Sequence, residues 1–326
     1  MSKGIKMRSA KDRHGRTYPV EELQRLADGG GVAPDLICDD PACGCDVRFV
    51  PRHPQNRANR VEPIDVPAYI GLTGKSEHVA GCRYNASGQL KIIAAQSDPE
   101  FLKALDDGKR ELRLLILHNG LSKFGLSGNA PTLPGAGAAS ASKTATQVLP
   151  SDKKLDSYLR TVSALLALRA QCESDALLAS ELILRLGTKR IPWKQFFFEH
   201  DRFDEAWELV AKGGNVYPIA VVGSVQSCRP YVGAGHETNF LNCRSLTRET
   251  SDPLRKESFD ISIAHPDAAW LNSFPVDSEI VMFGLWKATG PVEKAVSDKA
   301  DRARTVTYAN HRLMLNPKFK TQIVVT

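Results

Sequence analysis

Three cysteines and one histidine, in two short clusters, are the residues of this chain best suited to bind a metal ion. The first cluster reads Cys-Asp-Asp-Pro-Ala-Cys-Gly-Cys over residues 38–45, and the second reads His-Val-Ala-Gly-Cys over residues 78–82. Two close pairs of thiolate and imidazole groups supply the four donors of a tetrahedral zinc site. The sequence therefore predicts a Zn2+ site formed by Cys38, Cys43, His78 and Cys82.

Cys45 is the alternative to Cys43 as a ligand. Cys43 is preferred because Gly44 follows it, and glycine permits the tight turn that a chain makes around an ion. Four protein ligands leave no open position for a reactive water, so the zinc is expected to be structural. Zinc deaminases need a Glu beside the His ligand, and Glu77 adjoins His78, but the chain lacks their Pro-Cys-x-x-Cys sequence, so deaminase chemistry is not expected.

The amino-terminal residues resemble a known family. The shared residues are Ala10-Lys11-Asp12, Gly15-Arg16, Cys38, Cys43, Pro67-Ala68-Tyr69, His78 and Gly81-Cys82. Over about 80 residues this pattern resembles the zinc-finger segment of CoiA-like competence proteins. The resemblance implies a zinc module of the kind found in DNA-handling proteins. The nuclease core of that family contains an Asp followed by a Glu-x-Gln or Glu-x-Lys strand; we find no such strand, so nuclease activity is not carried over.

Composition is that of a mildly basic globular protein. The 326 residues carry a net charge of +6, which permits nucleic-acid binding through local patches but does not require it. No apolar run approaches the ~18 residues of a membrane span, and the amino terminus lacks the apolar stretch of a secretory signal. Seven cysteines, an odd number, fit reduced thiols and a metal better than disulfides. We therefore expect a cytoplasmic protein that does not bind membranes.

Changes in composition along the chain predict an α+β multi-domain protein. Residues 125–150 contain 19 Gly, Ala, Pro, Ser or Thr, too little apolar surface to form a core, and are interpreted as a flexible linker. A long surface loop is the alternative. The other predicted parts are a zinc-ribbon-like module (1–124), a small helical unit (151–214) and an OB-like β-barrel (215–326). A β-sandwich is the competing architecture for the last part.

Periodicity predicts the individual elements. Helices are expected over 20–27, 99–105, 155–166, 178–186, 203–210 and 266–272. Strands are expected over 47–50, 90–95, 216–225, 240–245, 259–264, 279–288, 304–309 and 320–325, and residues 112–117 are a strand or a helix end.

The predicted barrel carries the candidate nucleic-acid-binding residues. OB-type barrels bind single strands by stacking bases on aromatic side chains while basic side chains follow the phosphates. The stacking candidates are Tyr231, Phe240 and Trp286, and the phosphate candidates are Arg229, Arg244, Arg248, Lys287 and Arg312. The expected function is non-enzymatic nucleic-acid binding, with single-stranded DNA favoured, in DNA processing, a mobile element or defence. The alternatives are a protein-interaction adaptor and, more weakly, a nuclease with an unrecognised site; the sequence leaves the oligomeric state open.

Overall fold

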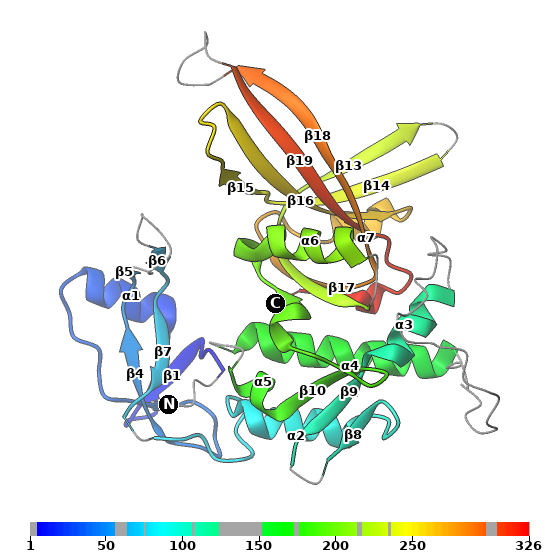
Figure 1. The fold of residues 1–326 in the computed structure, drawn as a ribbon. Helices are drawn as coiled ribbons and strands as arrows, with labels where there is room; N and C mark the ends of the chain where they lie inside the picture. The colour runs from blue at the N-terminus through cyan, green and yellow to red at the C-terminus, as the bar shows by residue number, and fades with distance from the viewer. Residues whose placement is uncertain are drawn as a thin grey trace, which may run out of the picture. The chain divides into compact units, whose positions relative to one another are not determined.

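The chain folds into two compact units. The computed structural model describes residues 5–55, 64–74, 76–105, 108–123, 152–172, 176–213, 217–233, 236–297 and 305–325. The first unit comprises Met1–Gln96 and Leu168–Glu181, and the second comprises Ser97–Ala167 and Leu182–Thr326 (Figure 1). The predicted linker lies outside the described residues, and the domain boundaries drawn from composition stay predictions.

The first unit contains a five-stranded antiparallel sheet. Its strand order is β2-β1-β3-β4-β7, and a separate hairpin joins β5 and β6. These strands are β1 (Ser9–Asp12), β2 (Thr17–Pro19), β3 (Leu36–Cys38), β4 (Asp46–Val50), β5 (His53–Gln55), β6 (Ile64–Val66) and β7 (Tyr69–Leu72). Its helices are α1 (Val20–Asp28), α2 (Ala86–Gln96) and α5 (Ala176–Glu181). The predicted helix over 20–27 and the predicted strand over 47–50 are thus confirmed.

Helix α2 corrects the strand that we expected over residues 90–95. Two neighbouring isoleucines in this segment favour a strand, but Asn85 directs the chain into a helix instead. Its side-chain oxygen accepts a hydrogen bond from the backbone N–H of Gly88 at 2.9 Å, which satisfies a donor of the first helical turn. At Gly88 a Cβ would lie 2.1 Å from the Ala80 carbonyl oxygen, so only glycine fits there.

The second unit begins with a small sheet and two helices. The sheet has the order β11-β10-β9-β8, in which β9 and β10 are parallel. Its strands are β8 (Leu102–Ala104), β9 (Arg110–Arg113), β10 (Leu182–Leu186) and β11 (Lys189–Ile191). The helices are α3 (Leu114–Lys123) and α4 (Asp152–Gln171), and residues 168–171 of α4 belong to the first unit. Two predicted helices are corrected here, since residues 102–104 form β8 and residues 182–186 form β10. A short apolar run fits a buried strand as well as a helix, and β10 has a partner on each side.

A nine-stranded sheet makes up most of the second unit. Its main path is β18-β19-β16-β14-β13-β17-β20, with β12 on β13 and β15 on β16. The strands are β12 (Phe197–Phe198), β13 (Ile219–Gly233), β14 (His236–Cys243), β15 (Leu246–Glu249), β16 (Arg255–His265), β17 (Glu279–Gly284), β18 (Trp286–Ser297), β19 (Thr305–Leu315) and β20 (Ile323–Val325). The helical segments are η1 (Trp193–Gln195), η2 (His200–Arg202), α6 (Phe203–Gly213), α7 (Ala268–Asn272) and η3 (Lys320–Gln322).

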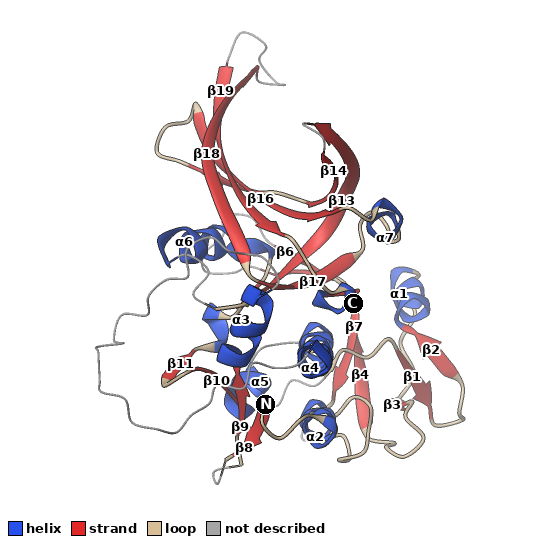
Figure 2. Cartoon of the chain, turned by 90° about the vertical axis from the view of Figure 1, so that its right-hand side faces the viewer, coloured by secondary structure: helices blue, strands red, loops and turns tan. Residues whose placement is uncertain are grey.

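This sheet is curved but open, which corrects the predicted closed barrel. Figure 2 shows the strands curling into an arch whose two sides are the β18–β19 and β13–β14 pairs. Closure would require the two end strands to pair. Within the described residues, β18 pairs with β19 and β20 pairs with β17, but β18 and β20 do not pair with each other.

The helices of the described residues include none with the length and apolar character of a membrane span.

Candidate metal centre and candidate nucleic-acid interface

The first cysteine cluster forms a tight loop between β3 and β4. Cys38 is the last residue of β3, and its backbone N–H donates to the Cys45 carbonyl at 2.8 Å. Gly44 has a φ of +67°, a left-handed conformation that other residues rarely adopt. This loop turns the side chains of Cys38, Cys43 and Cys45 toward one another.

The second cluster forms a turn before α2. The backbone N–H of Cys82 donates to the Val79 carbonyl at 3.0 Å, which folds His78 and Cys82 onto one turn. The side-chain amide of Asn85 donates to the His78 carbonyl at 2.8 Å. Asn85 therefore fixes the histidine loop and starts α2 at the same time.

Five metal-binding atoms meet where the two loops come together. His78 Nδ1 lies 3.5 Å from Cys43 Sγ, 3.3 Å from Cys45 Sγ and 3.5 Å from Cys82 Sγ. Cys38 Sγ lies 3.8 Å from Cys82 Sγ, and Cys43 Sγ lies 3.5 Å from Cys45 Sγ. Zinc–sulfur bonds of about 2.3 Å and zinc–nitrogen bonds of about 2.0 Å place neighbouring tetrahedral donors roughly 3.5–3.8 Å apart. The cluster thus has the dimensions of a zinc site.

The structure brings together all four predicted ligands and also Cys45. The donor atoms of Cys38, Cys43, Cys45 and His78 all lie within 4.8 Å of one another, so these four can hold a metal ion. Cys82 is within contact distance of Cys38 and His78. A tetrahedral ion takes four of these five donors, and the choice between Cys43, Cys45 and Cys82 stays a prediction.

The thiol acidities show what an ion would change. Burial raises the pKa of Cys38 and Cys82, and it raises the pKa of Cys45 to about 12. Burial also acts to raise the pKa of Cys43, but hydrogen bonds from the Cys45 backbone and His78 outweigh it and lower this pKa to about 6. A divalent cation binds thiolates, so metal binding would release protons from the neutral thiols.

Two acidic residues that sequence reasoning missed connect the loops. Asp39 accepts a hydrogen bond from Ser9 and pairs with Arg83 at 2.8 Å. Asp40 accepts from the backbone N–H groups of Ala42 at 3.0 Å and Arg83 at 3.0 Å. Each carboxylate therefore links the Cys38 loop to the residue that follows Cys82, in the way that outer-shell groups orient metal ligands. The acidic pair directly after Cys38 was the available signal.

The large sheet of the second unit has one polar and one apolar face. Directly paired residues of neighbouring strands share a face, so the register assigns the side chains. Ser227, Asn242 and Ser262 pair in sequence across β13, β14 and β16, and Arg229 pairs with Phe240. In the strand register, Asp260 lies opposite Arg312 of β19, and Arg312 lies opposite Thr289 of β18. We call this surface the polar face. Its further members by register are Lys287, Lys294, Tyr308, Asn310 and Met314.

The opposite face is apolar and carries α6. Its buried residues include Val225, Leu241, Phe259, Ile261, Ile263, Leu313 and Leu315. Trp207 of α6 lies against it, with its ring 6.3 Å from that of Phe259 and 4.4 Å from that of His311. The helix covers one side of the sheet, so the polar face is the side available to a ligand.

Three of the five predicted phosphate-binding residues lie on the polar face. Arg229, Lys287 and Arg312 are exposed there, and none forms an ion pair with a described carboxylate. Arg244 instead forms an ion pair with Asp277, and Arg248 forms an ion pair with Asp204 at 2.9 Å. Sequence reasoning missed Lys294, which is also exposed on this face without an ion pair in the described chain.

Of the three predicted stacking residues, only one has a described side chain on the polar face. Phe240 is half-buried on the polar face, as is Tyr308, which was not predicted. Trp286 is instead fully buried and donates from Nε1 to the Ile219 carbonyl at 3.2 Å, so it belongs to the core. Tyr231 pairs with Thr238 by register, and its side chain lies outside the described residues.

Comparisons with known proteins give little. No family model and no curated protein matches the chain. Among solved structures, a likeness is found to a "Plasmodium falciparum SSB complex with ssDNA" at 8% sequence identity. It covers 33% of this chain and 93% of that chain with a TM-score of 0.20. A likeness this weak carries no argument about this chain.

Proposed function

We propose that the protein binds nucleic acid, with single-stranded DNA favoured, through the polar face of its large sheet. One observation supports this above all. Four exposed cations, Arg229, Lys287, Lys294 and Arg312, share a sheet face without an ion pair to any carboxylate in the described structure. Unpaired cations on one surface attract a polyanion and release its counterions.

Aromatic residues on the same face favour a single strand over a duplex. Phe240 and Tyr308 lie on the polar face near these cations by register. An aromatic ring stacks on a base only when that base is unpaired and accessible. In this proposal the cations follow the phosphates while the rings stack on bases, and no covalent chemistry takes place.

The metal cluster of the first unit has a structural part in this proposal. Its donors connect β3 to the turn before α2, two segments that Asp39 and Asp40 also link through Arg83. A zinc ion bound by four of these donors would stabilise the unit without activating water. We assign no catalytic residue to the protein.

Binding of fluorescent oligonucleotides tests the proposal. Anisotropy should show tighter binding of the full chain to single-stranded DNA than to the matched duplex or RNA, weakening as salt is raised. The Arg229→Ala/Arg312→Ala variant should bind more weakly, whereas Arg160→Ala should not, because Arg160 pairs with Asp156 on α4. Absence of binding at low salt would exclude the function.

A protein-interaction adaptor is the second candidate, supported by a groove in the first unit. It has a volume of about 530 Å³ and is lined by Arg16, Tyr18, Glu22, Arg25, Leu26, Val32 and Pro34. Leu26 and Val32 are 39% and 88% exposed, which suits a surface that binds a partner. This function becomes the better one if no oligonucleotide binds.

A further inference from the structure

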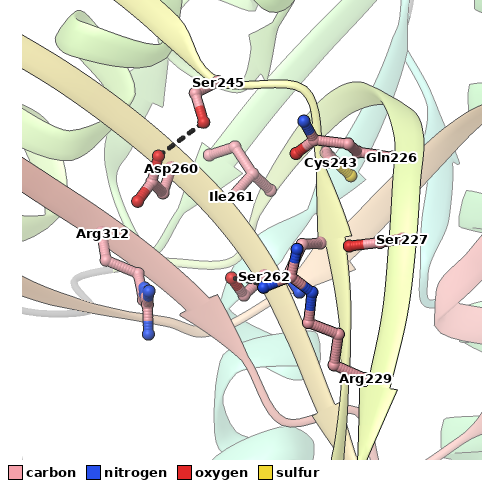
Figure 3. Close-up of a pocket in the computed structure, with 10 residues that line it drawn as sticks. Gln226, Ser227, Arg229, Cys243, Ser245, Asp260, Ile261, Ser262 and Arg312 are labelled. Carbon is pink, nitrogen blue, oxygen red and sulfur yellow. Dashed lines mark hydrogen bonds between the residues drawn. The ribbon is translucent and has the colours of Figure 1, made fainter.

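A small polar recess lies on the polar face between β13, β14, β16 and β19. Its volume is about 180 Å³, below the roughly 300–1,000 Å³ of pockets that take drug-sized ligands. Arg229, Asn242, Asp260, Ser262 and Arg312 line it together with Gln226, Ser227 and Ser245 (Figure 3). The recess is therefore large enough for one small polar group of a ligand but not for a drug-sized molecule.

Asp260 gives the recess a hydrogen-bond acceptor. Its Oδ1 accepts from the hydroxyl groups of Ser245 at 2.6 Å and Ser258 at 3.4 Å. Its Oδ2 accepts no hydrogen bond from the described side chains, and although Asp260 pairs with Arg312 by register, the two form no ion pair. One carboxylate oxygen thus remains available to a ligand.

Arg312, Arg229 and Asn242 give the recess its donors. Both guanidinium groups lie at its wall (Figure 3). The side-chain oxygen of Asn242 accepts from the Ser262 hydroxyl at 2.9 Å, which leaves its amide N–H groups for a ligand. The recess therefore offers a carboxylate acceptor beside an excess of donors.

This combination suits a base better than a phosphate. A carboxylate repels a phosphate but accepts hydrogen bonds from the N–H groups of a base edge. Guanine presents two adjacent donors, N1–H and N2–H2, that match one carboxylate, and beside them the acceptors O6 and N7, which arginine recognises. No other DNA base combines these groups.

We propose that this recess binds one guanine of a single strand, with Asp260 Oδ2 accepting from both N1–H and N2–H2 and Arg312 donating to O6. The inference rests on the proposed function, because the strand reaches the recess only by crossing the polar face. Arg229, Lys287 and Lys294 then follow the phosphates on either side.

Oligonucleotides that differ in one base test the proposal. The probes are oligo-dT, the same strand with one central guanine, and the same strand with inosine, which lacks the N2 amino group, in that position. The guanine strand should bind at least about 5-fold more tightly than oligo-dT, since a base contact through two hydrogen bonds discriminates by roughly 5- to 150-fold. The inosine strand should lie between the two.

Asp260→Asn should abolish the difference between guanine and inosine, and it should bind oligo-dT more tightly than the wild type does because a negative charge has been removed. Glu208→Gln removes a charge from α6, where Glu208 pairs with Lys212, and should keep the wild-type preference. Equal binding of guanine and thymine strands by the wild type, at an affinity that still falls with salt, overturns the guanine site but not the proposed function. Loss of binding to every strand overturns both.

Discussion

Contacts between the polar face and phosphates can be measured from the salt dependence of binding, as the slope of log K against the logarithm of the salt concentration. Three of its cations, Arg229, Lys287 and Lys294, are exposed and form no ion pair with the described residues. Each phosphate contact on a single strand contributes about −0.7 to the slope of log K against log salt, so three predict about −2. Affinity for oligo-dT should then fall roughly 20-fold between about 50 mM and 200 mM salt.

Removing two of these cations should remove most of the salt dependence. In the Arg229→Ala/Lys287→Ala variant the slope should become about −0.7, so that affinity falls only about 3-fold over the same range. Both side chains are exposed, and their truncation should leave the fold intact. Anisotropy titrations at five salt concentrations give the slope, and Arg160→Ala is the control for loss of a positive charge. A variant slope equal to that of the wild type would refute phosphate contact by these residues, whatever the change in affinity.

Three further predictions concern the fold. The purified protein should contain about one zinc per chain by elemental analysis, and Cys82→Ser should make the first unit protease-sensitive while sparing the large sheet; metal-free folded protein would contradict this. Gly88→Ala should destabilise the first unit by about 1–3 kcal/mol or more because its Cβ meets the Ala80 carbonyl, whereas Gly81→Ala, with open space around it, should not. Equal thermal stability of the two variants would contradict the close approach of Gly88 to Ala80. Burial lowers the pKa of His311, so its contribution to stability is present above the unfolded value of about 6.5 and is lost as pH falls below it. His311→Phe should therefore flatten the decline in unfolding free energy between about pH 7 and pH 5, as measured by urea denaturation.

The metal cluster was predictable from residue types because close cysteines and histidines have few other uses in such a pattern. Its exact ligand set was not, since Cys43, Cys45 and Cys82 all reach His78 only after two separate loops fold. The outer carboxylates of Asp39 and Asp40 were missed for the same reason. Spacing along a chain identifies candidate donors, whereas the choice between them depends on loops that the spacing does not describe.

Helices and strands were predicted correctly where the apolar residues followed one clear periodicity. The prediction failed where local hydrogen bonds determined the conformation. Helix α1 followed from its apolar spacing and terminal glycines, but α2 begins at a capping bond from Asn85 that apolar spacing does not reveal. Trp286 could not be assigned by alternation alone, because both it and Phe283 are buried. Alternation separates two faces of a strand but does not say that both are covered.

Two irregularities in strand pairing determine the composition of the polar face. In β13, Val225 pairs with Cys243 and Ser227 with Asn242, so one extra residue is inserted between them. Strict alternation would place Arg229 on the same face as buried Val225; the bulge moves it to the other face.

In β18 the register shifts between Thr289 and Val292, so that Lys294 joins Lys287 on the polar face. Glu293 turns away and pairs with Arg255 at 2.6 Å. Without this shift an acid would occupy the position of a cation. The sequence of each strand therefore shows which cations are present, but the two bulges place Arg229 and Lys294 on the polar face. A bulge is a property of two paired strands and cannot be inferred from either strand alone.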